Sequence, residues 1–188
     1  TLSLHDALPI FIHEHALDID HARLTTAKGD VLDFDAVSSA VEGHDAVIVA
    51  IGRRQGSDPL HEPAIANVIH AMALHGVSRL SVLSAAGTFA RTDPRLSFGF
   101  RARIATTLRA TYDDLERMEQ RVMASALEWT IVRPVGLSDS PAEGTYRISI
   151  TGELLAKAGT VPRGDVAGVL LKSVESDAYL RKTVAVGV

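Results

Sequence analysis

The chain has 188 residues, of which 46% are hydrophobic and 22% are charged, and its formal net charge is −4 at pH 7. This length suits one domain with a sizeable core, and a disordered chain would have fewer apolar residues and a larger net charge. Because the chain has no cysteine, disulfide frameworks, zinc-thiolate sites and thiol nucleophiles are excluded. The acidic balance argues against a nucleic-acid partner, which favours a basic surface.

The start of the chain shows no targeting signal. Thr1 opens a decapeptide that lacks the basic start and the apolar run of a secretory signal. The longest apolar run covers residues 46–51 and is far shorter than the roughly 20 residues that span a bilayer. We therefore expect a soluble cytoplasmic protein without a membrane partner.

After an irregular start to about Thr25, short apolar runs alternate with longer segments of helical periodicity. Residues 46–51 are continuously apolar and end at Gly52, which predicts a strand buried on both faces. Residues 60–75 carry apolar side chains at helical spacing and are followed by Gly76, which predicts an amphipathic helix.

The second half of the chain repeats this alternation. Residues 80–83 and 129–132 predict two further buried strands, the second ended by Arg133 and Pro134, and residues 112–126 predict a helix between them. The tail predicts a short strand near Ile148, a helix over 166–174 with Asp165 as its N-cap, and a last strand over 183–188. Such β/α alternation is typical of a parallel sheet with helices on both faces.

Open parallel sheets bind ligands beyond the carboxyl ends of their strands. The segments expected there are 52–54, 84–87 and 133–136, and each contains glycine or other small residues that let a flat ligand approach the backbone. Turn chemistry explains any one of these segments. The three together favour a ligand site.

Five segments, in this order, resemble the atypical short-chain dehydrogenase/reductases with an NAD(P)H-binding domain. The branches they resemble most are the NmrA-like one and the biliverdin reductase B/flavin reductase-like one, and the likeness runs from about residue 22 to the C-terminus. The segments are GDVLD at 29–33, EGHDAVIV at 42–49 followed by Gly52, AMALHGV at 71–77, YDDLERME at 112–119 and EWTIVRP at 128–134.

The resemblance implies a doubly wound, Rossmann-like parallel sheet with NADP or NAD lying across the strand ends. The carboxylate that the resemblance assigns to the adenine is that of Asp30. The alternative interpretation is that Asp30 is a turn residue after Gly29. The residues that the resemblance assigns to the cofactor are Asp30 and Val31 at the adenine, Ala50, Ile51, Gly52 and Arg53 near the ribose, Ser84 and Ala85 at the nicotinamide, and Pro134, Val135 and Gly136 at the carboxamide.

The family opens with a strand and a Gly-x-x-Gly-x-x-Gly turn, whose N–H groups meet the diphosphate at a helix N-terminus. This chain has no glycine before Gly29. We therefore expect an N-terminally truncated chain that lacks the first strand and the glycine-rich loop, with residues 1–21 irregular or non-native and residues 22–188 forming a partial domain. The strand at 46–51 then loses a neighbour, unless residues 8–12 replace the missing strand, and cofactor affinity should be weak or nil.

The chemistry expected of this fold differs from that of ordinary short-chain dehydrogenases. Their Tyr-x-x-x-Lys pair is missing, because no tyrosine has a lysine four residues later. In the reductase branch the cofactor passes hydride directly to an electron-poor π-system, and solvent can supply the proton. Ser84 is a candidate to orient the carboxamide or relay a proton, or a structural hydrogen bonder, and Tyr112 is a second candidate that packing also explains.

Two charged clusters remain. Five arginines occur between residues 91 and 109 against one acid, which fits a solvated lid or a basic flap for an anionic acceptor such as FMN. The histidines and aspartates between residues 13 and 21 match no metal-site spacing, so no metal is expected.

The sequence thus predicts an NAD(P)H-dependent reductase acting on a small-molecule electron acceptor that is flavin-like or otherwise conjugated. The alternative is a non-catalytic NAD(P)-sensing protein of the NmrA kind. A third hypothesis is that the chain has no activity, because half of the cofactor site is not present. The acceptor, the choice between NADH and NADPH, and the oligomeric state stay open.

Overall fold

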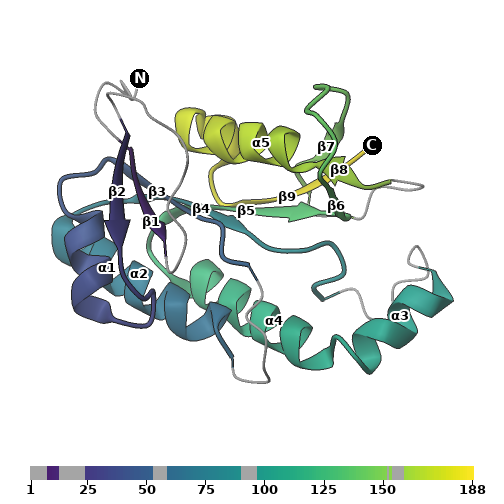
Figure 1. Ribbon diagram of the computed structural model, residues 1–188, viewed down its shortest axis with the longest axis horizontal. Coiled ribbons are helices and arrows are strands. Elements are labelled where there is room, and N and C mark those ends of the chain that lie inside the picture. Colours follow the sequence, from purple (N-terminus) through teal and green to yellow (C-terminus); the bar gives the residue numbers. More distant parts are fainter. Residues whose placement is uncertain (1–7, 13–23, 53–58, 90–96, 152, 154–158) are drawn as a thin grey trace.

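The strands of the central sheet run in the order β3-β4-β5-β9-β7 in a computed structural model, which describes residues 8–12, 24–52, 59–89, 97–151, 153 and 159–188 (Figure 1). The first four strands pair in parallel, and β7 runs antiparallel to β9. Their bounds are Ala46–Val49 for β3, Arg79–Leu83 for β4, Glu128–Pro134 for β5, Arg147–Ser149 for β7 and Lys182–Gly187 for β9. The expected α/β fold with a mostly parallel sheet is confirmed.

Helices cover both faces of this sheet, as a doubly wound fold requires (Figure 1). Helix α5 lies against one face, and α2 and α4 lie against the other, with α1 packed on α2. The bounds are Phe34–Val41 for α1, His61–His75 for α2, Phe98–Ala105 for α3, Arg109–Ala124 for α4 and Arg163–Glu175 for α5, and a 3-10 turn, η1, covers Asp177–Tyr179.

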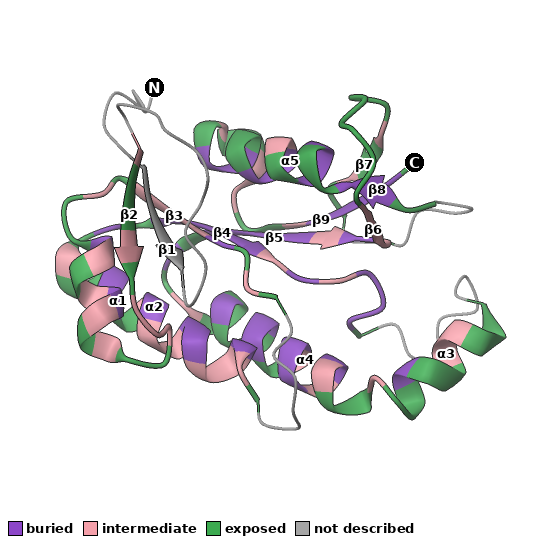
Figure 2. Cartoon of the chain, viewed as in Figure 1, coloured by how far each residue is buried: buried purple, intermediate pink, exposed green. Residues whose placement is uncertain are grey.

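Two apolar clusters fill the space between the sheet and its helices (Figure 2). The larger cluster joins β3, β4 and β5 to α1, α2 and α4, with Ile65, Met72 and Ile131 fully buried. The smaller cluster joins the other face to α5 through Val132, Val169 and their neighbours. Since both faces are covered, the strands are continuously apolar rather than alternating, which is the pattern that predicted them.

The N-terminal strands form a separate pair. Strand β1, Leu8–Ile12, pairs in parallel with β2, Leu24–Lys28, and not with β3. The sequence left open that residues 8–12 replace the missing strand beside β3. They do not, because they pair with β2. Within the described residues, β3 is an edge of the five-stranded sheet and keeps one side of its backbone without a strand partner.

Two predicted boundaries are wrong for identifiable reasons. Strand β5 continues to Pro134, because a terminal residue needs no N–H and the Pro134 carbonyl accepts from the Ala86 N–H at 2.9 Å. Helix α5 begins at Arg163, so Asp165 lies in its first turn and is not the N-cap. The Asp165 carboxylate instead accepts the backbone N–H groups of Glu143 and Gly144.

The remaining elements are short or follow the predicted positions closely. Strands β6, Leu137–Ser138, and β8, Val161–Pro162, form a small parallel pair. Helix α2 ends at the left-handed Gly76, as its C-terminal glycine predicts. Helices α1 and α3 were not predicted. None of the described helices is long and apolar enough to cross a membrane.

Candidate functional site

The carboxyl ends of β4 and β5 are joined by backbone hydrogen bonds that continue past the paired registers. The Ser84 N–H donates to the Val132 carbonyl at 2.8 Å, and the Ala86 N–H donates to the Pro134 carbonyl at 2.9 Å. Because of these bonds, residues 84–86 run beside residues 132–135 at one edge of the sheet. The structure thus brings two of the three expected strand-end segments together.

A buried charged network ties this edge to helix α4. Ser84 Oγ donates to Glu119 Oε1 at 2.5 Å, and Arg133 donates to both carboxylate oxygens of Glu119, through Nε at 3.0 Å to Oε1 and through Nη2 to Oε2. Glu119 is 0% exposed and the Arg133 side chain is 13% exposed. Moving charged groups from water into the protein interior costs free energy. The Glu119–Arg133 pair offsets this cost because each group forms hydrogen bonds with the other.

Glu119 was not among the predicted site residues, although a signal for it was present in the sequence. Leu115, Met118 and Val122 mark the buried face of α4, and Glu119 lies four residues after Leu115 on that same face. A carboxylate on a buried helix face needs a partner. Arg133, at the end of the adjoining strand, is that partner, and it also lies over the ring of Phe89, 5.6 Å from the ring centroid.

Tyr112, the second catalytic candidate, is buried at the same edge. Its hydroxyl donates to the Ala86 carbonyl at 3.2 Å, and its ring meets Phe100 edge to face. Burial raises the pKa of Tyr112, and the nearby Arg103 guanidinium only partly opposes this. The geometry accordingly gives Tyr112 a packing and hydrogen-bonding role and, within the described part of the chain, shows no group that activates its phenol.

Gly87 lets helix α3 approach the end of β4. Its φ of +100° disfavours other residues, and a Cβ would lie 3.1 Å from Ile104 Cδ1 and 3.3 Å from Tyr112 Cε1. The glycine here serves packing against α3 and the left-handed turn. A Cβ added at Gly136 would lie 3.1 Å from Thr160 Cγ2, so this glycine makes room for Thr160. A Cβ added at Gly52 would have no described atom within 4 Å. Of the three strand-end glycines, only Gly52 fits the expectation of an open approach for a ligand.

We expect Gly87→Ala to destabilise the protein by about 1–3 kcal/mol, from the strained φ and from overpacking against Ile104. Urea denaturation measures this difference. Gly99→Ala is the matched control, since it lies in α3 itself and its Cβ meets nothing within 4 Å. A Gly87→Ala variant as stable as the control contradicts this account of the turn.

The residues assigned to the adenine lie in the turn before α1. Asp30 Oδ1 accepts the Leu32 N–H at 2.9 Å, and the Val31 carbonyl accepts from Asn67 Nδ2 at 3.0 Å. Ala50 is exposed and Ile51 packs against the larger core cluster, while Arg53 lies outside the described residues. The adenine and ribose assignments remain predictions.

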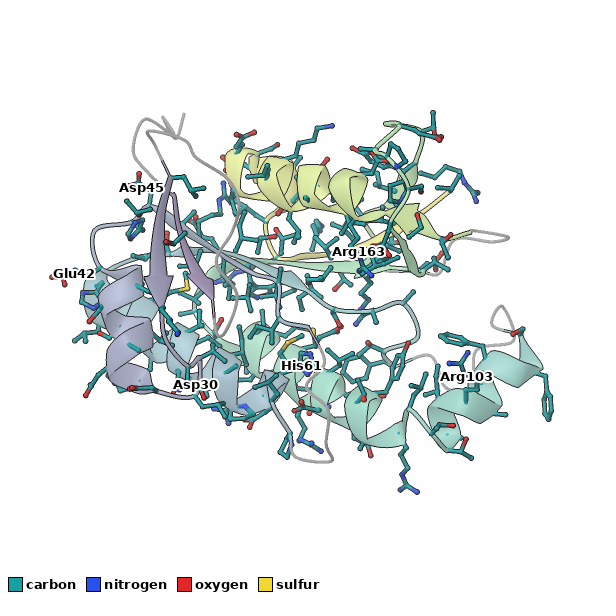
Figure 3. All side chains as sticks on the ribbon, viewed as in Figure 1. Asp30, Glu42, Asp45, His61, Arg103 and Arg163 are labelled. Atoms are coloured by element: carbon teal, nitrogen blue, oxygen red, sulfur yellow. The ribbon has the colours of Figure 1, made fainter. Side chains whose placement is uncertain are left out.

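A second buried cluster lies where α2 begins against α4 (Figure 3). The Asp114 carboxylate accepts the backbone N–H groups of Leu60, His61 and Glu62 at 2.8, 2.8 and 3.1 Å, and His61 Nδ1 lies 3.0 Å from Asp114 Oδ2. The Asp114 side chain, which belongs to α4, therefore caps the N-terminus of α2. Burial raises the pKa of Asp114, but these hydrogen bonds outweigh it, so the pKa lies below its ordinary value.

The basic segment is described only in part. Residues 91 and 95 lie outside the described residues, Arg101 and Arg103 lie on α3, and Arg109 begins α4, where it pairs with Asp113 at 3.6 Å (Figure 3). The histidines and aspartates at 13–21, from which no metal site is expected, also lie outside the described residues. Among the residues that are described, no group of three His, Asp or Glu side chains forms a metal site.

Comparison with known proteins points to a nucleotide cofactor. Residues 12–177 match the NAD(P)H-binding protein family. A short-chain dehydrogenase/reductase of Veillonella parvula, solved in complex with NADP, superposes with a TM-score of 0.74 at 18% identity, over 90% of this chain and 74% of that one. ChuY, an anaerobillin reductase of Escherichia coli, superposes with a TM-score of 0.69 at 23% identity, over 87% of this chain and 74% of that one.

At one end of such a cofactor, the chemistry of the described residues is compatible with the assignment made from the sequence, which remains a prediction. The Ser84 hydroxyl at the strand ends suits the polar carboxamide of a nicotinamide ring. At the N-termini of α1 and α2 the fit to a diphosphate fails, because the first N–H groups of α1 are taken by the Asp33 carboxylate and those of α2 by Asp114. The glycine-rich turn that meets a diphosphate is not found before Gly29.

Proposed function

Since the chain belongs to the NAD(P)H-binding protein family, we propose that it is an NAD(P)H-dependent reductase whose acceptor is flavin-like or otherwise conjugated. The observation that carries this proposal is the buried network of Ser84, Glu119 and Arg133 at the carboxyl ends of two parallel strands. Buried, fully paired charges at this edge are costly and occur where a site must be held rigid. When bound, NAD(P)H supplies the hydride.

The residues of the chain orient the reactants and do not supply the hydride. Ser84 holds the carboxamide, and the wall of Pro134, Val135 and Gly136 keeps its place because its backbone is tied to β9 and β8. The Tyr112 phenol, with its raised pKa and its bond to the Ala86 carbonyl, holds the adjoining turn. Solvent then provides the proton, as the missing Tyr-x-x-x-Lys pair requires.

The acceptor we propose is flat and anionic. Phe89 is 47% exposed at this edge, and an exposed aromatic ring offers a face on which a conjugated ring can stack. Arg101 and Arg103 lie on α3, which packs against Gly87 at the end of β4. They therefore add positive charge to this edge of the sheet. The neighbour that reduces anaerobillin supports a conjugated acceptor by analogy of fold.

The test mixes the chain with NADPH and FMN, each at millimolar concentration to offset weak binding. Steady loss of the near-ultraviolet absorbance of NADPH, which stops in the Ser84→Ala variant, is the expected result. Binding of NADPH without turnover, with FMN and other conjugated acceptors alike, contradicts the reductase and favours the regulatory alternative.

We expect the affinity for NADPH to be weaker than micromolar. A diphosphate binds through free N–H groups at a helix N-terminus, and Asp33 and Asp114 occupy those of α1 and α2. Isothermal titration calorimetry measures the dissociation constant. A micromolar value overturns this prediction and indicates that residues 13–23, or another segment, supply a diphosphate site.

A further inference from the structure

The carboxylate of Glu119 fixes the direction of the Ser84 hydroxyl proton. Ser84 Oγ donates to Glu119 Oε1, and the guanidinium of Arg133 donates to both oxygens of the same group. A carboxylate in a bidentate pair with arginine accepts hydrogen bonds and has none to donate. The one proton of Ser84 is therefore committed to Glu119, and Ser84 Oγ retains its capacity to accept.

The neighbouring hydroxyl does not use that capacity. Thr88 Oγ1 donates to the Ala85 carbonyl at 2.8 Å and lies 3.4 Å from Ser84 Oγ. Since a hydroxyl has a single proton, Thr88 has none left for Ser84. Ser84 is 7% exposed at the strand end, so a ligand group that reaches it meets an acceptor and not a donor.

We propose that Glu119 is a positioning residue that makes Ser84 a hydrogen-bond acceptor, so that the site selects a nicotinamide carboxamide through its N–H group. This inference rests on the proposed function and goes beyond it, because it assigns Glu119 a positioning role and makes Ser84 a hydrogen-bond acceptor. It also favours one of the three interpretations of Ser84 that the sequence left open, which are orienting the carboxamide, relaying a proton and forming a purely structural hydrogen bond. Ser84 orients the carboxamide, and it does not pass a proton to the acceptor.

The test compares two oxidised ligands, NADP⁺ and its acetylpyridine analogue, in which a methyl ketone replaces the amide and removes the N–H donor. Binding is measured by calorimetry or by ligand-observed NMR, without turnover. We expect the wild-type chain to bind NADP⁺ about three- to tenfold more tightly than the analogue, which is the effect of one neutral hydrogen bond.

Three variants connect this preference to the network. In Ser84→Ala the ratio of the two dissociation constants should fall to about one, whereas Ser81→Ala, on the same strand with its hydroxyl bonded to Ser173 at 2.7 Å, should retain it. The double variant Glu119→Leu/Arg133→Met removes the acceptor and leaves no unpaired charge, and apolar replacement of a buried pair is tolerated. There the Ser84 hydroxyl is free to donate, so the ratio should fall to about one or invert.

The outcomes separate the two claims. Equal binding of both ligands by the wild-type chain, or a preference that survives in the double variant, overturns the assignment of Glu119 and leaves the reductase standing. Loss of the preference in the double variant but not in Ser84→Ala shows that Arg133 acts directly on the ligand, which also overturns it. Failure of both ligands to bind overturns the proposed function together with this inference.

Discussion

Glu119→Ala should be the most damaging single substitution at the strand ends, lowering the free energy of unfolding by about 3–5 kcal/mol. It leaves the Arg133 guanidinium buried without its carboxylate and removes the acceptor of the Ser84 hydroxyl. Both losses add to the cavity left by the side chain. Urea denaturation followed by circular dichroism measures the change, and the slope of the transition checks that folding stays cooperative.

Two further variants show that the damage comes from an unpaired buried charge. Glu119→Leu/Arg133→Met removes both charges and should recover most of the stability. Asp139→Ala breaks an arginine-carboxylate pair of 2.7 Å with Arg163 on the surface, where Asp139 is 86% exposed, and should change stability by no more than about 0.5 kcal/mol. If the double variant is as unstable as Glu119→Ala, lost packing and not lost charge pairing explains the effect.

The fold was predictable because its strands are apolar on both faces. Continuous apolar runs located β3, β4 and β5, and helical spacing with a C-terminal glycine located α2. Helices α1 and α3 escaped prediction because they are short, at eight residues each. Their N-caps, the Asp33 side chain for α1 and the Ser97 hydroxyl for α3, were sequence signals that the prediction did not use. The pairing of β1 with β2 depends on long-range contacts that no local pattern encodes.

The candidate site was predictable only in outline. The expectation that strand-end segments converge followed from the rule for parallel sheets and holds for residues 84–86 and 132–135. The reasons for the glycines did not follow, because Gly87 and Gly136 make room for Ile104 and Thr160. Contacts between elements decided these positions, as they decided the pairing of Glu119 with Arg133. The roles of the site residues toward a cofactor remain predictions.

Asp114→Asn should lower the free energy of unfolding by about 2–4 kcal/mol near neutral pH, because hydrogen bonds to a charged acceptor are worth about 1.5–3 kcal/mol each and the amide replaces only part of the set. The Asp114 carboxylate accepts three backbone N–H groups at the start of α2, where the helix dipole also favours negative charge. The loss should appear as weaker docking of α2 on α4.

The pH dependence of this loss follows from the lowered pKa of Asp114. A carboxylate with a lower pKa in the folded state contributes its full stabilisation above its unfolded pKa of about 3.9, and loses it as the pH falls toward the folded pKa. The difference in stability between wild type and Asp114→Asn should therefore be large near neutral pH and shrink as the pH drops below about 4. Denaturant titrations across this range measure it.

Asp113→Asn is the matched control for this prediction. The substitution is the same and the position is adjacent, but the Asp113 side chain is 33% exposed and pairs with the 70% exposed Arg109 side chain in an i,i+4 arrangement, a kind of pair that is worth about 0.5 kcal/mol or less. A difference for Asp114→Asn that stays constant down to strongly acid pH would mean that Asp114 acts through packing and not through its charge.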